Sequence, residues 1–155
     1  MTALFCPFSE IAMSTFKALR VHQVEKATQA RFELITLNDL TPGNVVIRVA
    51  YSSVNYKDAL AVTGKGRILK GYPKVPGIDL SGTVESSEDA RYKKGDAVLV
   101  TGCNIGESLD GGYAEFARLP ADALVHLPRS LSLKDAMAIG TAGFTAAFAL
   151  RRMLE

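Results

Sequence analysis

The sequence predicts a mainly β fold with a few helices, in the form of a sandwich or a barrel. Up to about residue 127, short runs of apolar and β-branched residues alternate with Gly, Pro, Asn and Asp, a pattern typical of such folds. After Pro128 the pattern changes to a long Ala-rich segment that opens with a helix-start signal. The 155 residues, 48% of them hydrophobic and 22% charged, suffice for one core and about one domain.

Turn signals at 41–44 and 93–96 help to separate the expected strands. In the segment 45–54, alternation places Val45, Ile47 and Val49 on one face together with Tyr51, and we expect this face to pack inward. The segments that we expect to form strands are residues 16–21, 31–37, 45–54, 78–85, 97–101, 113–118 and 124–127.

Two helices are expected. Residues 55–62 form a short one that ends before Thr63-Gly64. A longer one begins at Ser132, because Ser followed three residues later by an acidic residue is a capping-box pattern. Gly140 and Gly143 each cost about 1 kcal/mol relative to Ala inside a helix, so they indicate close packing or a break.

Composition excludes several classes of function. The formal charge of +2 gives no basis for a nucleic-acid or anionic-membrane surface, and the longest uncharged stretch, 136–150, is too short to span a bilayer. The opening residues lack the features of a secretory signal, so we expect a cytoplasmic protein. Cys6 and Cys103 are expected to be free thiols, and His22 and His126 to be structural or solvated.

Common chemical motifs are missing from the sequence, which contains no GxGxxG, Walker A loop, HExxH, GxSxG or EF-hand loop. Four segments in order nevertheless resemble the medium-chain dehydrogenase/reductase superfamily, and within it zinc-independent quinone oxidoreductases of the acrylyl-CoA reductase type. They are SSVNYKDALAVTGKG (52–66), PKVPGIDLSGTV (73–84), DGGYAE (110–115) and IGTAGFTA (139–146). The resemblance covers essentially residue 13 to the end.

This resemblance implies a GroES-like, partly open β-barrel catalytic domain over residues 13–127. Residues 128–155 are then the helix that connects it to an NADPH-binding Rossmann domain, which this sequence lacks, and residues 1–12 are an extension. We therefore expect an N-terminal portion of a reductase, inactive by itself. Family dimers assemble through the missing domain, which leaves the oligomeric state of this chain open.

Zinc is not expected. The zinc-dependent members carry Cys where this chain has Asn55 and Gly-His-Glu where it has Gly77-Ile78-Asp79, and neither an amide nor an isoleucine replaces a thiolate or an imidazole as a ligand. The resemblance implies instead NADPH-dependent reduction of an activated C=C bond, acrylyl-CoA to propionyl-CoA. Hydrogen-bond donors around an enolate-like transition state suffice for such chemistry.

The expected site residues follow from the matched segments. Tyr56 is expected to be catalytic and cofactor-binding, because its counterpart faces NADPH; the alternative is a half-buried helix anchor. Asn55 either orients substrate or cofactor as a catalytic residue or is an ordinary N-cap. Thr141 and Thr145 are expected to bind the cofactor through their hydroxyls, the alternative being small-residue packing.

Other residues in the matched segments carry weaker hypotheses. Lys57 and Asp58 are either a surface pair, which we favour, or a proton-handling pair. The basic loop formed by Lys65, Arg67 and Lys70 could meet coenzyme A phosphates, although such loops are usually only solvated. Cys103 lies where the family has a tryptophan, which puts substrate breadth in question. Alternatives for the whole protein are a quinone or enone oxidoreductase acting on free carbonyl compounds, and a non-catalytic GroES-like module that binds a protein.

Overall fold

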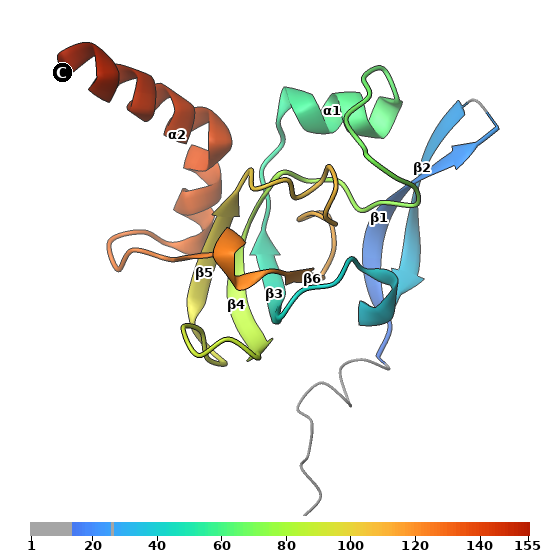
Figure 1. The fold of residues 1–155 in the computed structure, drawn as a ribbon, viewed down its shortest axis with the longest axis horizontal. Coiled ribbons are helices and arrows are strands. Elements are labelled where there is room, and N and C mark those ends of the chain that lie inside the picture. The colour runs from blue at the N-terminus through green and yellow to red at the C-terminus, as the bar shows by residue number, and fades with distance from the viewer. Residues whose placement is uncertain (1–13, 26) are drawn as a thin grey trace, which may run out of the picture.

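Antiparallel strands make up most of the structure, a computed structural model that describes residues 14–25 and 27–155 (Figure 1). The expected extension, residues 1–12, lies outside the described residues. The elements in chain order are β1 (Phe16–Val24), β2 (Ala27–Ile35), the 3-10 turn η1 (Leu37–Asp39), β3 (Val45–Tyr51), α1 (Tyr56–Thr63), β4 (Asp79–Ser87), β5 (Ala97–Thr101), β6 (Phe116–Leu119), η2 (Ala121–Ala123), β7 (Val125–His126) and α2 (Leu133–Leu154). The predicted class, mainly β with a few helices, is confirmed.

The strands form two antiparallel sheets, a β1–β2 hairpin and a five-stranded sheet in the order β6-β3-β4-β5-β7. Residues 113–115 connect the two sheets. Leu19 N–H donates to Tyr113 O (2.8 Å) and Glu115 N–H to Lys17 O (3.0 Å), while Val49 N–H donates to Glu115 O (2.9 Å). Because the pairing of the described strands leaves β2 and β7 as free edges, the barrel is open.

Two apolar clusters stabilise this arrangement. One lies along the five-stranded sheet and includes Ile47, Leu80 and Leu119. The other lies under the hairpin and includes Phe16 and Val46. Since β3 passes between the clusters, its first residues are buried on both faces rather than on the one that alternation predicts.

At the other end of β3 the prediction for Tyr51 is wrong. The register with β4 shifts between Val49 and Tyr51, and the side chain of Tyr51 is 45% exposed. A bulge of this kind re-aims the residues that follow it, so simple alternation no longer holds. Val45 and Ile47 are buried as predicted, and Val49 is partly buried.

Several expected boundaries move. β2 begins at Ala27 rather than at residue 31, and β6 begins at Phe116 rather than at residue 113. The short helix is confirmed as α1, which ends at Thr63 and is followed by Gly64 in the left-handed conformation (φ 69°). Its Ala61 packs with Val21 of β1 in a small third cluster.

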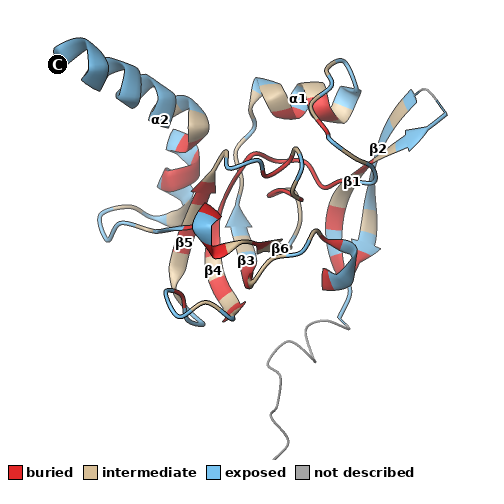
Figure 2. Cartoon of the chain, in the orientation of Figure 1, coloured by how far each residue is buried: buried red, intermediate tan, exposed pale blue. Residues whose placement is uncertain are grey.

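α2 begins as predicted, with the hydroxyl of Ser132 accepting a hydrogen bond from Asp135 N–H (3.1 Å). Gly140 breaks the helix (φ 49°, ψ −162°), whereas Gly143 stays helical. The first half buries Ala136 and Met137, and the second half runs away from the sheets, exposed along its length (Figure 2). Neither α1 nor α2, the α-helices of the described residues, is both long and apolar enough to cross a membrane.

Candidate functional site

The end of β3, the start of β4 and the break in α2 meet at Asp79. Its side chain is fully buried, and its carboxylate accepts four hydrogen bonds from neutral donors. These come from Ser53 Oγ (2.5 Å), Asn55 Nδ2 (2.9 Å), Thr141 N–H (3.0 Å) and Thr141 Oγ1 (2.5 Å). We call Ser53, Asn55, Asp79 and Thr141 the Asp79 cluster. It brings three of the matched segments together, 52–66, 73–84 and 139–146, although they are far apart in the sequence.

Glycine is required where α2 passes this carboxylate. A Cβ on Gly140 would lie 2.9 Å from Asp79 Oδ2 and 3.2 Å from Ser53 Oγ. The φ of +49° is also one that residues with a side chain rarely adopt. Glycine at position 140 therefore permits both the break in the helix and its close approach to Asp79.

A second buried carboxylate, Asp58, lies beside the cluster and is only 2% exposed. Its Oδ1 accepts from Ile78 N–H (3.0 Å), and its Oδ2 from Asn55 N–H (2.9 Å). The expected pairing of Lys57 with Asp58 is wrong in both of its forms, since Lys57 Nζ binds Glu107 Oε1 at 2.8 Å. Asp58 instead fixes the start of α1 and the backbone that leads into β4.

Asn55 connects the two carboxylates. Its Nδ2 lies 2.9 Å from Asp79 Oδ2, 3.3 Å from Asp58 Oδ2 and 3.0 Å from Ser53 Oγ. An amide nitrogen has two hydrogens, and here three acceptors compete for them. Asn55 is also the N-cap residue of α1. Its donor atoms are therefore engaged inside the protein.

Tyr56, the next residue, is 80% exposed. The alternative of a half-buried anchor is therefore wrong. Its ring and hydroxyl are accessible to a ligand, and it follows Asn55 of the Asp79 cluster in the sequence.

Tyr113 is a site residue that was not singled out from the sequence, although it lies in the matched segment 110–115. Its hydroxyl donates to Ser53 O (3.1 Å), and a Cβ on Gly77, whose φ is 101°, would come within 2.7 Å of its ring. Burial, followed by the negative charge of Asp58, raises the pKa of Tyr113 above its usual value. The shift moves ionisation of the phenol further above neutral pH.

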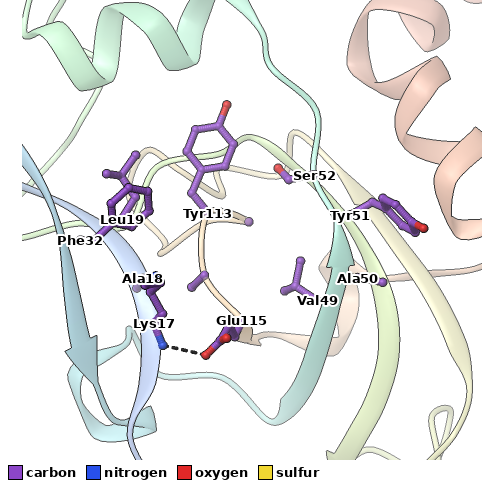
Figure 3. Close-up of a pocket in the computed structure, with 12 residues that line it drawn as sticks. Lys17, Ala18, Leu19, Phe32, Val49, Ala50, Tyr51, Ser52, Tyr113 and Glu115 are labelled. Atoms are coloured by element: carbon purple, nitrogen blue, oxygen red, sulfur yellow. Dashed lines mark hydrogen bonds between the residues drawn. The ribbon is translucent and has the colours of Figure 1, made fainter.

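The Tyr113 ring also lines a cavity of about 480 Å³ between the hairpin and β3 (Figure 3). Leu19, Phe32 and Val49 give this cavity a largely apolar wall. In Figure 3 the Tyr113 hydroxyl points away from the Lys17–Glu115 contact, in which Lys17 N–H donates to Glu115 Oε2 at 2.8 Å.

The two threonines of α2 use their hydroxyl hydrogens internally. Thr141 donates to Asp79 Oδ1, and Thr145 Oγ1 donates to the carbonyl of Thr141 (2.7 Å). Each oxygen keeps the capacity to accept a hydrogen bond. Of the two, Thr145 is the exposed one.

The remaining candidate residues lie apart from the Asp79 cluster or at the surface. Lys65, Arg67, Lys70 and Cys103 are exposed, and Cys6 lies outside the described residues. His22 lies 2.8 Å from Glu33 and His126 stacks on Tyr92, as expected for structural histidines. Within residues 14–25 and 27–155, no three His, Cys, Asp or Glu side chains are grouped so as to hold a metal ion.

The model of the alcohol dehydrogenase GroES-like domain matches residues 41–129, and the chain belongs to this family. The resemblance to the medium-chain dehydrogenase/reductase superfamily is thereby confirmed. Acrylyl-CoA reductase AcuI of Ruegeria pomeroyi is 50% identical over 137 residues, covering 87% of this chain and 42% of the relative. The quinone oxidoreductase of Sus scrofa is 36% identical over 108 residues, covering 68% of this chain and 31% of the relative.

Two solved structures are also similar. The yhdH oxidoreductase of Salmonella enterica, crystallised in complex with NADP, has a TM-score of 0.86 at 48% identity and covers 88% of this chain and 42% of its own. The yhfP protein of Bacillus subtilis, with NAD bound, has a TM-score of 0.86 at 46% identity and covers 90% of this chain and 42% of its own. The chain thus spans about two fifths of the length of such relatives.

Proposed function

We propose that this chain is the substrate-side domain of an NADPH-dependent reductase of activated C=C bonds, acting on acrylyl-CoA to give propionyl-CoA. The observation that carries the proposal is the Asp79 cluster, in which Asn55 and Thr141 both bind one carboxylate, together with the exposed Tyr56 that follows Asn55; we call the cluster and Tyr56 the Asp79 corner. The similarity to an acrylyl-CoA reductase at 50% identity supports the substrate.

The residues at this corner fit a nicotinamide cofactor. Tyr56 offers an exposed aromatic face, and the hydroxyl oxygens of Thr141 and Thr145 can accept hydrogen bonds from a carboxamide. When bound, the cofactor supplies the hydride. This chain supplies orientation and a donor, the Tyr56 hydroxyl, for the oxygen on which negative charge develops.

The proposed chemistry uses no zinc. Asn55 and Ile78 stand at two ligand positions of the zinc-dependent members, and the amide of Asn55 is directed at carboxylates. A carbonyl conjugated to the alkene accepts the developing charge, so hydrogen bonding replaces Lewis-acid assistance.

In this proposal residues 13–127 are the substrate domain and residues 128–155 lead to the cofactor domain. The second half of α2 exposes Phe144 (59%), Phe148 (58%) and Met153 (77%), a surface that another part of a longer protein would cover. Hydride transfer requires donor and acceptor at roughly 3–3.5 Å, and one side of a cleft does not hold both. We therefore expect the 155-residue chain to be inactive alone.

NADPH oxidation with acrylyl-CoA tests the proposal. The protein extended by its cofactor domain should turn over, and the bare chain should not. Tyr56→Phe should lower kcat by about 10²-fold, in the range for removal of one oxyanion donor, without changing the melting temperature. Tyr72→Phe, which alters another exposed tyrosine outside the corner, is the matched control and should leave kcat unchanged.

The second candidate is a quinone or enone oxidoreductase, favoured by the similarity to the quinone oxidoreductase of Sus scrofa. Activity of the extended protein with a quinone and not with the thioester would select it. Lack of activity with both would contradict the reductase and favour the protein-binding module.

A further inference from the structure

We propose that Asp79 is a positioning residue that caps the second half of α2 from another part of the fold and ties its direction to the Asn55–Tyr56 corner. The inference concerns this chain by itself. It does not rest on the proposed function.

Burial of the Asp79 carboxylate is energetically unfavourable by itself. Asp79 is 0% exposed, and a buried carboxylate is stable only where hydrogen bonds replace its hydration. The four donors come from two places, residues 53–55 and Thr141, which lies 62 positions away in sequence. The favourable environment of Asp79 therefore exists only when both segments are in place.

The backbone of α2 supplies one of these donors. Gly140 is non-helical, so Thr141 starts a new helical segment, and the first N–H groups of a helix have no acceptor within that helix. Thr141 N–H is donated to Asp79 Oδ2, and its hydroxyl to Oδ1. A negative group at this end is also favoured by the helix dipole. Asp79 thus caps the N-terminus of this segment, as Ser132 caps the first half of α2.

One oxygen of Asp79 binds groups from two segments. Asp79 Oδ2 accepts from both Thr141 N–H and Asn55 Nδ2, and Asn55 immediately precedes Tyr56 at the start of α1. A rotation of the second half of α2 would withdraw Thr141 from the oxygen that orients Asn55. The direction of the helix and the geometry of the corner are therefore set together.

The substitution Asp79→Asn changes the hydrogen bonds of this side chain while leaving its packing almost unchanged. Asparagine has nearly the shape of aspartate, but its amide offers one acceptor oxygen and an NH₂ group that would face donors. Loss of a hydrogen bond to a charged group should raise the equilibrium constant for local opening about tenfold or more. Asp79→Asn should thus loosen Thr141 while the sheets stay intact.

Amide hydrogen exchange, followed by NMR on the 155-residue chain, is the test. In Asp79→Asn, exchange at Thr141 should accelerate about tenfold or more, and the side-chain NH₂ signals of Asn55 should shift, while Val84 in β4 keeps its protection. Asp135→Asn, at the exposed cap of the first half, is the matched control and should leave Thr141 unchanged.

Variants of the donor extend the test to the case in which Asp79→Asn does not fold. Thr141→Val keeps the N–H and loses the hydroxyl, so exchange at position 141 should be intermediate, and Thr141→Ser should restore the wild-type value. Equal acceleration at Thr141 and Val84 in these variants, or no acceleration at position 141, would overturn the inference. None of these measurements uses cofactor or substrate, so their outcome is independent of the proposed reaction.

Discussion

Replacement of Gly140 by alanine should destabilise the chain far more than a substitution at an ordinary glycine. The backbone there (φ 49°, ψ −162°) lies close to a region that is essentially restricted to glycine, at a cost of about 1–3 kcal/mol for other residues. The new Cβ would also lie 2.9 Å from Asp79 Oδ2, so the carboxylate would have to move. Such a movement loses at least one charge-assisted hydrogen bond, about 1.5–3 kcal/mol.

Entropy of the unfolded chain offsets about 0.4–1 kcal/mol of this loss, which leaves a net destabilisation of about 2–5 kcal/mol. For a chain of this length the melting temperature should fall by roughly 4–20 °C. The variant should remain folded at 25 °C, because domains are typically stable by about 5–15 kcal/mol. Urea denaturation followed by circular dichroism gives the difference in unfolding free energy directly.

Two other glycines supply the controls. Gly71 has open space around it and no positive φ, so Gly71→Ala should change stability by less than about 1 kcal/mol. Gly102 also has open space but a φ of +70°, so Gly102→Ala should cost only the backbone strain, about 1–2 kcal/mol. A Gly140→Ala value no larger than that of Gly102→Ala would refute the tight contact with Asp79.

Three further predictions concern charged groups. Double-mutant cycles by urea denaturation should give a coupling of at most about 1 kcal/mol between Lys57 and Glu107, because the pair is partly exposed. Asp58→Ala should cost about 3 kcal/mol or more by leaving buried N–H groups unpaired, and a large coupling of Lys57 to Asp58 would contradict the structure. A hydrogen bond from the Arg91 side chain and a second from its backbone N–H lower the pKa of Asp89 to about 2. The contribution of the ionised Asp89 to folding stability is therefore complete above the unfolded pKa of about 3.9, and it is lost as pH falls through about 2. NMR titration should show this, with a return toward the usual pKa in Arg91→Ala; an Asp89 pKa near 4 in the unmodified chain would disprove it.

Local signals predicted the elements that depend on local chemistry. Ser132 caps α2 because a hydroxyl at that position reaches the N–H three residues further on, and the four-residue motif 132–135 is enough to predict this contact. Gly140 marked a break because glycine is costly inside a helix. The segment 97–101 became β5 with the expected bounds. In each case the determining interaction lies within one turn or one strand.

Long-range contacts decided what could not be predicted. A surface pair of Lys57 and Asp58 was the favoured expectation, yet Asp58 is buried, and the chain returns at Ile78 to present an N–H to it. Asp79 was noted only as the residue that replaces a glutamate in zinc-dependent relatives, and its partner Thr141 lies 62 positions further on. A sequence pattern records each residue type but not which distant groups meet, so the Asp79 cluster required the structure.

The connection made by residues 113–115 also bears on how the protein is synthesised. The β1–β2 hairpin is local and can form as soon as it leaves the ribosome, but Lys17 must wait for Glu115, 98 residues later. At translation rates of about 5–20 residues per second this interval is roughly 5–20 s. During that time the edge of β1 lacks the hydrogen bonds that Leu19 and Lys17 make with residues 113–115. The nascent chain is thus exposed to association for seconds, and slower synthesis would lengthen the interval.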